Sequence, residues 1–460
     1  MVNEYFYKIY SNIHRLAKIL LQKNRKSNYR MVSLNPSNFS KNEEIEINGS
    51  YINDIEIDIP TNINKKNLFP VENIVVIGSN RHLKDSYVAN KNSNLSLGVN
   101  IKDAKITWEA FLNTSIIPAG YKNGGLHYTG YIADDINEWC LPSWVWTNAA
   151  LVRMYCNKGK TTKALLIGDL LLKQQLECGG WIVRNDYKSE GAIPTLAPND
   201  SAYIANNAFI ELYKATNKAV YLDAAKKCAD WIIETARPDG LVWSGYDMKN
   251  KEWIKDYIIV DTGFTAGLFA NLYDITNDNK YKIFLEKFVS QYVNLFFNPS
   301  KKGFSTSINI QGQQGGGMFA RGQAWALEGL IPAYRVLKNE KLKQVIDATI
   351  SNFIEKQLKN GGWTYNFAKP LLGEDCKGVA VIAKSLMEWN LIKQNDQVVI
   401  SVNKALEWCV KQTANNGECK GGIFSFCMEG AVVHNFYTKT AFVYSSAYAI
   451  EVYDMLKEGR

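Results

Sequence analysis

The chain has 460 residues, of which 46% are hydrophobic and 12% aromatic, a globular composition able to fill a large core. The net charge of +8 is modest for this length and the basic residues are spread along the chain, so charge gives little support for nucleic-acid binding. The eight cysteines form no C-x-x-C pair and only four histidines are present, which argues against a zinc site and favours thiols in a reducing compartment. We therefore expect neither a metal nor a cofactor.

Residues 1–104 are interpreted as an N-terminal extension. Residues 1–26 place apolar side chains at helical spacing among lysines and arginines, which predicts an amphipathic helix rather than a signal peptide. Packing on its own domain and peripheral contact with a membrane or a partner both remain open for this helix. Residues 44–60 and 72–78 are typical of short strands. No segment is long and apolar enough to cross a bilayer, and we expect a cytoplasmic protein.

From about residue 105, a glycine turn followed by an aromatic or large apolar residue recurs at nearly one period. Two of these turns share the pattern Gln-x-x-x-Gly-Gly-Trp, at residues 175–181 and 357–363. A fixed period of this kind indicates a repeat architecture. We expect each turn to use positive φ where the chain reverses after a helix, and each tryptophan to cover the mouth of the fold or pack in its core. The six turns contain Gly125, Gly180, Gly240, Gly303, Gly362 and Gly422, with intervals of 55, 60, 63, 59 and 60 residues.

Each period also contains two helical patterns. Residues 218–236 and 340–358, before a glycine turn, are amphipathic, whereas residues 201–216 and 322–337, after one, are apolar almost all round. Amphipathic helices face water on one side and uniformly apolar helices are buried, so the alternation predicts an outer and an inner ring. Six such hairpins give an all-α fold, an (α/α)6 toroid over residues 105–460.

Polar residues that open the inner helices should meet at one end of this toroid. An Asp at a helix start is often an N-cap, but several acids beside Arg321 and Trp325 also suit glycoside chemistry, with one carboxyl as general acid and another as base. A guanidinium beside them suits a substrate that carries its own carboxylate. In chain order the pairs are Asp134 and Asp135, Asn199 and Asp200, Asp261 and Thr262, Arg321 and Gln323, Glu374 and Asp375, and Lys439 and Thr440.

The segment MFARGQAWALEGLIPAYR (318–335) resembles the ARGQAW segment of unsaturated glucuronyl hydrolases and unsaturated rhamnogalacturonyl hydrolases, glycoside hydrolase families 88 and 105. Residues 199–233 are similar to the stretch around that family's first site Asp, and residues 258–276 to the stretch around its catalytic Asp. The resemblance covers roughly residues 135–455. It implies hydration of the ring double bond of an unsaturated uronic acid, after which the product opens and releases the neighbouring sugar.

Carried over residue by residue, the resemblance makes Asp261 the general acid/base and Asp200 its partner carboxylate. Arg321 would orient the reacting sugar and Trp325 would stack on it. Gln311 or Gln313 would match a substrate-contacting Gln of the family. The other expected substrate contacts are Gln323, Asn199, Asp135, Trp181 and Trp363.

The chain departs from the family in its histidines. The family usually has a His beside the first Asp, where this chain has Asn199, and no His lies between His127 and His434. The substrate class, an acidic oligosaccharide or polysaccharide, follows from the resemblance more firmly than the reaction does. A glycosidase, lyase or epimerase of polysaccharide synthesis, and a toroid that binds glycan without catalysis, stay open. A terpene-cyclase-like toroid would need an Asp-rich D-x-D-D motif, which is absent.

Overall fold

The computed structural model describes most of the chain after residue 100. The N-terminal helix expected at residues 1–26 and the strand expected at 72–78 lie outside the described residues. Within residues 44–60 and just beyond, the predicted short strands are present as β1 (Glu46–Ile47), β2 (Ser50–Tyr51), β3 (Ile57–Asp58) and β4 (Ile63–Asn64). Besides these strands, the described residues are 101–119, 123–132, 138–139, 145–182, 195–248, 250–368, 374, 378–425 and 440–458.

The outer helices are amphipathic, as predicted. In α10, for example, Tyr281, Phe284, Leu285 and Phe288 fall at helical spacing on one buried face. Aspartate or asparagine side chains cap α10, α12 and α14 by accepting from a backbone N–H of the first turn. The outer helices are α3 (Ile101–Thr114), α5 (Thr161–Lys173), α8 (Ala219–Thr235), α10 (Asn279–Phe296), α12 (Glu340–Lys356) and α14 (Asp396–Lys411).

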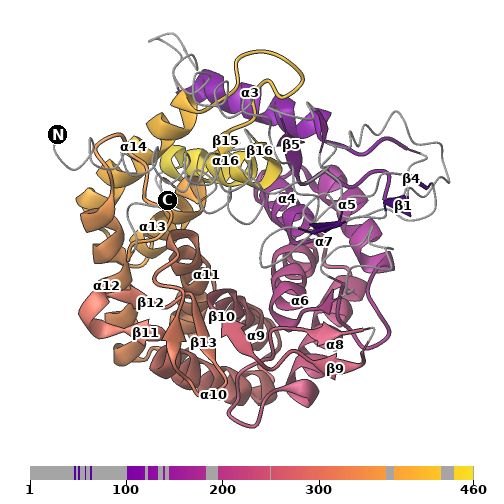
Figure 1. The fold of residues 1–460 in the computed structure, drawn as a ribbon, viewed down its shortest axis with the longest axis vertical. Helices are drawn as coiled ribbons and strands as arrows, with labels where there is room; N and C mark the ends of the chain where they lie inside the picture. The colour runs from indigo at the N-terminus through magenta and orange to yellow at the C-terminus, as the bar shows by residue number, and fades with distance from the viewer. Residues whose placement is uncertain are drawn as a thin grey trace.

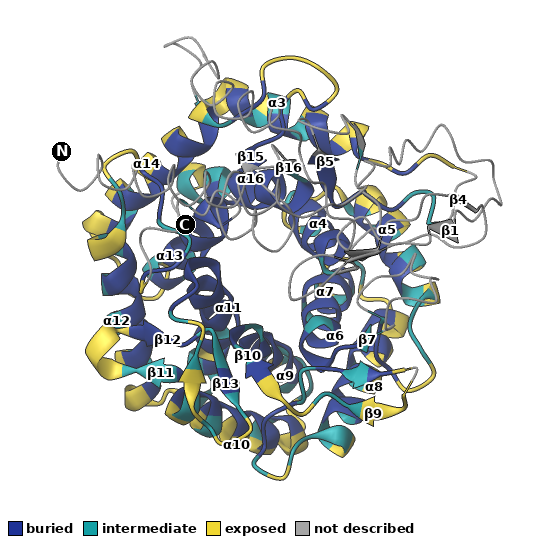
Figure 2. Cartoon of the chain, viewed as in Figure 1, coloured by how far each residue is buried: buried dark blue, intermediate teal, exposed yellow. Residues whose placement is uncertain are grey.

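The inner helices are buried on nearly every face, and exposed residues gather on the outer helices and the loops (Figure 2). One inner helix runs through a π-helical segment, η3 (Ala205–Ile210), between α6 (Pro198–Ile204) and α7 (Glu211–Thr216). Such segments are rare and often occur near functional sites. The remaining inner helices are α4 (Val145–Asn157), α9 (Phe264–Thr276), α11 (Ala320–Leu337), α13 (Val379–Asn390) and α16 (Val443–Lys457).

The inner helices contact one another in a closed ring, in the order α4, α6, α9, α11, α13, α16 and back to α4. Each outer helix packs against this ring, and α3, the first outer helix, lies against α16, the last inner one (Figure 1). Lys105 on α3 and Lys158 after α4 both form ion pairs with Asp454 of α16, which joins the two ends of the ring. The described part of the chain therefore forms the predicted (α/α)6 toroid, and none of its helices is long and apolar enough to cross a membrane.

The two Gln-x-x-x-Gly-Gly-Trp turns have the same internal bonds. Gly179 and Gly361 have φ of 105° and 96°, which confirms the positive φ predicted for these turns. The amide of Gln175 donates to the carbonyl of Gly179 and to that of Ala224 on the next outer helix. Gln357 makes the matching bonds to Gly361 and Ser401. This glutamine thus fastens the turn that ends one outer helix to the following outer helix.

Short antiparallel strands lead from the outer helices towards the inner ones. Three sheets matter for the placement of the site: β7–β8–β9, β10–β13–β14 and β15–β16–β5–β6. The strands are β5 (Gly130–Ile132), β6 (Glu138–Trp139), β7 (Thr195–Leu196), β8 (Tyr246–Asp247), β9 (Glu252–Trp253), β10 (Tyr257–Ile259), β11 (Phe297–Asn298), β12 (Gly303–Phe304), β13 (Ser307–Asn309), β14 (Gln314–Gly315), β15 (Phe424–Ser425) and β16 (Thr440–Phe442).

Candidate active site

Asp200, Asp261 and Arg321 come together where three inner helices begin. Asp200 lies in the first turn of α6, and Arg321 in the first turn of α11. Asp261 lies in η4 (Val260–Gly263), a 3-10 turn between β10 and α9. The carboxyl of Asp261 interacts electrostatically with both Asp200 and Arg321. Two acids and one guanidinium, 121 residues apart in the sequence from Asp200 to Arg321, therefore share one end of the ring.

Glycines allow the turn that carries Asp261 to approach α11 closely. A Cβ on Gly329 would lie 1.9 Å from the carbonyl oxygen of Gly263, and a Cβ on Gly322 would lie 2.4 Å from a methyl group of Val260. From the outer ring, the Tyr292 hydroxyl donates to the Val260 carbonyl at 2.6 Å and holds the turn in place. The glycines of the ARGQAWALEG segment are thus needed to bring Asp261 beside Arg321.

The environment of Asp261 disfavours its charged form. Burial raises the pKa of the Asp261 carboxyl to about 7, and the neighbouring Asp200 carboxylate adds to this rise. The guanidinium of Arg321 acts in the opposite direction. Near neutral pH, Asp261 can therefore both give a proton and take one back, which is the property required of a general acid/base.

The side chain of Arg321 is held by contacts with aromatic residues. Its Nη1 donates to the hydroxyl of Tyr444 at 2.7 Å. The guanidinium carbon lies 4.8 Å from the ring centre of Phe319 and 4.7 Å from that of Trp325, which are cation–π distances. Because the side chain is 8% exposed, these contacts fix the direction in which its remaining N–H groups point.

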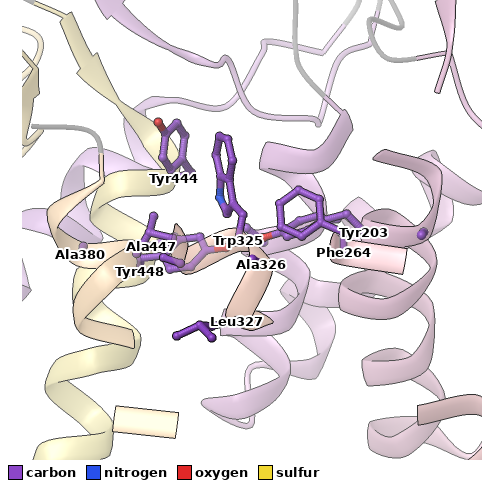
Figure 3. Packing of buried hydrophobic residues seen from close by; sticks show 14 of the residues in the cluster. Tyr203, Phe264, Trp325, Ala326, Leu327, Ala380, Tyr444, Ala447 and Tyr448 are labelled. Atoms are coloured by element: carbon purple, nitrogen blue, oxygen red, sulfur yellow. Dashed lines mark hydrogen bonds between the residues drawn. The ribbon is translucent and has the colours of Figure 1, made fainter. Parts of the chain in front are cut away.

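Aromatic rings from four inner helices form the surroundings of this group. Trp325 is 7% exposed and packs against Trp146, Phe264 and Phe319. Trp325, Phe264 and Tyr444 are seen together in Figure 3. The sequence analysis considered the polar residues at the helix starts and Trp325, and so missed the other aromatic residues. Trp146, Phe264 and Tyr444 occupy the first turns of α4, α9 and α16, the same position as Arg321 in α11, and this shared position is the signal that could have found them.

Three of the predicted substrate contacts have side chains that are fully buried and bond within the fold. Gln323 is 0% exposed, and its amide bonds the backbone of Phe304 and Phe319. Trp181 and Trp363 are also 0% exposed, and each indole N–H donates to a carbonyl ten residues earlier, in the outer helix that precedes the turn. These tryptophans pack in the core, one of the two positions expected for them.

The other predicted rim residues have different positions. The carboxylate of Glu374 accepts from Asn360 and from the indole of Trp408 on outer helix α14. Gln311 and Gln313 lie on the exposed tip of the β13–β14 hairpin, where their backbone N–H groups bond Asn309. Their contact with substrate stays a prediction. Asp134, Asp135, Asp375 and Lys439 lie outside the described residues.

A buried ionic cluster lies two helical turns below the site. Arg153, Glu328 and Glu451 each follow a residue of the site or its aromatic surroundings by seven positions in the same helix, a distance of about 10 Å. Arg153 bonds both oxygens of Glu451, at 3.0 and 2.8 Å, and one of Glu328 at 3.2 Å. The hydroxyl of Tyr448 also donates to Glu328, at 2.7 Å. This cluster ties α4, α11 and α16 together beneath Arg321.

Solved structures of low sequence identity share this fold. An unsaturated glucuronyl hydrolase specific for heparin is 15% identical, with a TM-score of 0.60 over 83% of this chain and 98% of that one. An unsaturated glucuronyl hydrolase from Bacillus sp. GL1 is 14% identical, with a TM-score of 0.60 over 78% and 97%. A sugar epimerase from a ruminal bacterium is 14% identical, with a TM-score of 0.62 over 78% and 98%.

At these identities the structural likeness establishes the toroid and nothing beyond it. No curated protein sequence matches the chain. The family model of Glycosyl Hydrolase Family 88 matches residues 141–453, which include Asp200, Asp261 and Arg321. That match covers more than half of the chain and confirms the resemblance found in the sequence: the protein belongs to Glycosyl Hydrolase Family 88 and is a glycoside hydrolase.

Proposed function

We propose that this hydrolase acts on oligosaccharides that end in an unsaturated uronic acid, and that it hydrates the ring double bond of that sugar. The observation that carries the proposal is the carboxyl of Asp261, with a pKa of about 7, set between Asp200 and Arg321. Ordinary carboxyl groups are fully ionised at neutral pH and make poor proton donors there. Unsaturated glucuronyl hydrolases are among the structures that share the fold.

In the proposed reaction, Asp261 in its acid form protonates the double-bond carbon remote from the substrate carboxylate. Water adds to the other carbon, which bears the ring oxygen, and its proton passes to the Asp261 carboxylate, so the acid is restored. The hydrated ring opens, and the hemiacetal left at the glycosidic carbon releases the neighbouring sugar. Asp200 keeps the pKa of Asp261 high throughout.

Substrate binding is assigned to the groups around this pair. A guanidinium has five N–H donors, so Arg321 can bind the substrate carboxylate while it bonds Tyr444. The edge of Trp325 would lie against the sugar ring. Asn199 is 3% exposed and adjoins Asp200, and among the described residues its Oδ1 has no hydrogen-bond partner, so it can accept from a sugar hydroxyl.

The test measures loss of the double bond's ultraviolet absorbance with a panel of unsaturated uronyl disaccharides. We expect wild type to consume the absorbance and Asp261→Asn to be slower by about a thousandfold, because its amide donates no proton to carbon. The matched control is Asp256→Asn, the same change at an exposed carboxylate five residues earlier, which should keep wild-type rates.

Two outcomes would overturn the proposal. Equal rates for Asp261→Asn and wild type would remove Asp261 from the chemistry. Wild-type enzyme that leaves every double bond intact, while it cleaves or epimerises saturated acidic glycans, would assign another carbohydrate reaction to the same site.

A further inference from the structure

Asp261 and Arg321 each follow one of the two edge strands of a small sheet. In the sheet β10–β13–β14, strand β10 leads directly into Asp261, and strand β14 leads through a short segment into Arg321. Strand β13 lies between them, paired at Ser307 with Ile259 on one side and with Gly315 on the other. The segments that carry Asp261 and Arg321 therefore diverge at the first residue of β13.

Thr306, the residue just before β13, bonds both of these segments. Its carbonyl accepts from the N–H of Val260, the neighbour of Asp261, at 2.9 Å. Its own N–H donates to the carbonyl of Gly317 at 2.9 Å. Its hydroxyl accepts from the N–H of Phe319 at 3.0 Å and donates to the carbonyl of Gly316 at 3.1 Å.

The hydroxyl of Thr306 bonds the residue that begins α11. Phe319 is the N-cap residue of α11, and in a capping box a side chain at the third helical position would accept from its N–H, but that position is Gly322. The hydroxyl of Thr306 accepts this bond from another segment. Gly316 has a φ of 73°, and a Cβ there would lie 2.7 Å from the Cβ of Thr306, so the glycine run before Arg321 is shaped to receive this side chain.

We infer that Thr306 is a positioning residue that fixes Arg321 relative to Asp261. It touches neither the reacting atoms nor Arg321 itself in this assignment; it holds the backbone on both sides. The effect of Thr306 on the reaction rate rests on the proposed function, because only an acid/base reaction reports the protonation of Asp261. The effect of Thr306 on the electrostatics of Asp261 does not depend on that function.

The electrostatic consequence follows from the titratable and charged groups that face Asp261. They are Asp200 from α6, Tyr292 from α10 and Arg321 from α11. Of these groups, only Arg321 lies directly after the segment, Gly316 to Phe319, that the Thr306 hydroxyl bonds. Loss of the hydroxyl should let the guanidinium move away from Asp261, and the carboxyl should then hold its proton to higher pH.

The experiment compares Thr306→Val, which keeps the shape and both backbone bonds but removes the hydroxyl, with Thr306→Ser, which keeps the hydroxyl. The first readout is a ¹³C NMR titration of the Asp261 carboxyl, assigned with Asp261→Asn. We expect the midpoint to rise by about half a pH unit in Thr306→Val and to stay at the wild-type value in Thr306→Ser. The second readout is the pH profile of kcat/KM, which should fall roughly tenfold in Thr306→Val with its upper limb moved in the same direction.

The two readouts separate the two proposals. A raised NMR midpoint in Thr306→Val supports the positioning role whether or not any unsaturated substrate is consumed. An unchanged midpoint in Thr306→Val, or an equal rise in Thr306→Ser, overturns it even if the enzyme hydrates unsaturated sugars. Should Thr306→Val fail to fold, Thr306→Ala removes the same hydroxyl and is judged by the same criteria.

Discussion

Asp261 is a carboxyl group that the folded protein keeps partly protonated at neutral pH. Burial and the nearby Asp200 carboxylate raise its pKa to about 7, well above its ordinary value of 3.8. The same features that suit it to donate a proton in the proposed reaction make its charged form unfavourable in the fold. In that reaction, function and stability are opposed at this residue, as is common in active sites.

This opposition predicts how stability depends on pH. Between about pH 4 and pH 7 the native state binds the Asp261 proton and the unfolded state does not, so the free energy of unfolding falls as pH rises. Asp261→Asn cannot ionise. Its stability relative to wild type should therefore grow from about pH 5 to about pH 8. The gain should be on the order of 1–2 kcal/mol, because Asp261 as a whole residue is half-buried and solvent screens part of the effect.

Urea titrations of both proteins at the two pH values measure this difference. The exposed Asp256→Asn serves as the control and should show the same difference from wild type at each pH. A constant difference between Asp261→Asn and wild type would contradict the raised pKa.

At the scale of elements, the glycine turn is where consecutive hairpins are joined. A Cβ on Gly361 would lie 2.1 Å from the carbonyl oxygen of Lys404, in the outer helix that follows. The neighbouring Gln357 bonds that same helix at Ser401, and Trp363 bonds the helix that precedes the turn. One heptapeptide thus links two outer helices, which explains why the same sequence motif occurs twice.

Gly361→Ala should be strongly destabilising for two reasons. The φ of 96° costs about 1–2 kcal/mol for a residue with a side chain, and the contact with Lys404 forces the turn away from α14. We expect a total loss of roughly 3 kcal/mol or more. Gly417→Ala is the matched control, because Gly417 has a φ of 70° but nothing within 4 Å of the added Cβ. Equal losses in urea unfolding for both variants would show that the close approach to α14 contributes nothing.

At the scale of the molecule, the ring is closed by contacts between residues far apart in the chain. Arg153 on α4 and Glu451 on α16 are 298 positions apart, and both are buried. Arg153 also bonds Asn207 of the π-helical segment at 2.7 Å and Glu328 of α11. The first, second, fourth and last inner helices therefore meet at one guanidinium beneath the site.

Glu451→Gln should destabilise the toroid by roughly 3 kcal/mol, because it leaves the buried Arg153 with incomplete charge compensation. The control is Glu355→Gln, the same change in an exposed ion pair with Lys302, for which a loss below about 1 kcal/mol is expected. Calorimetric unfolding of the two variants beside wild type gives the comparison. Similar melting temperatures for both would mean that the cluster does not stabilise ring closure.

The sequence by itself determined the repeat and the alternation of its helices. Amphipathic and uniformly apolar segments are local patterns, since the burial of each face is written in residues three and four positions apart. The glycine turns were equally readable, because a positive φ constrains the residue type at its own position. Asp200, Asp261 and Arg321 were identified through the similarity of their sequence motifs to the family, and the structure brings them together.

Only the tertiary structure decided which polar and aromatic residues lie near Asp261 and Arg321. Glu374 and Gln323 stand near helix starts as Asp261 and Arg321 do, yet they bond an outer helix and a strand end. Tyr444 and the supporting Thr306 were not recognised in the sequence, because their partners lie on other segments. The orientation and the protonation of a side chain depend on neighbours that are distant in the chain. The pKa of Asp261 is raised only once α6, α9 and α11 have packed together.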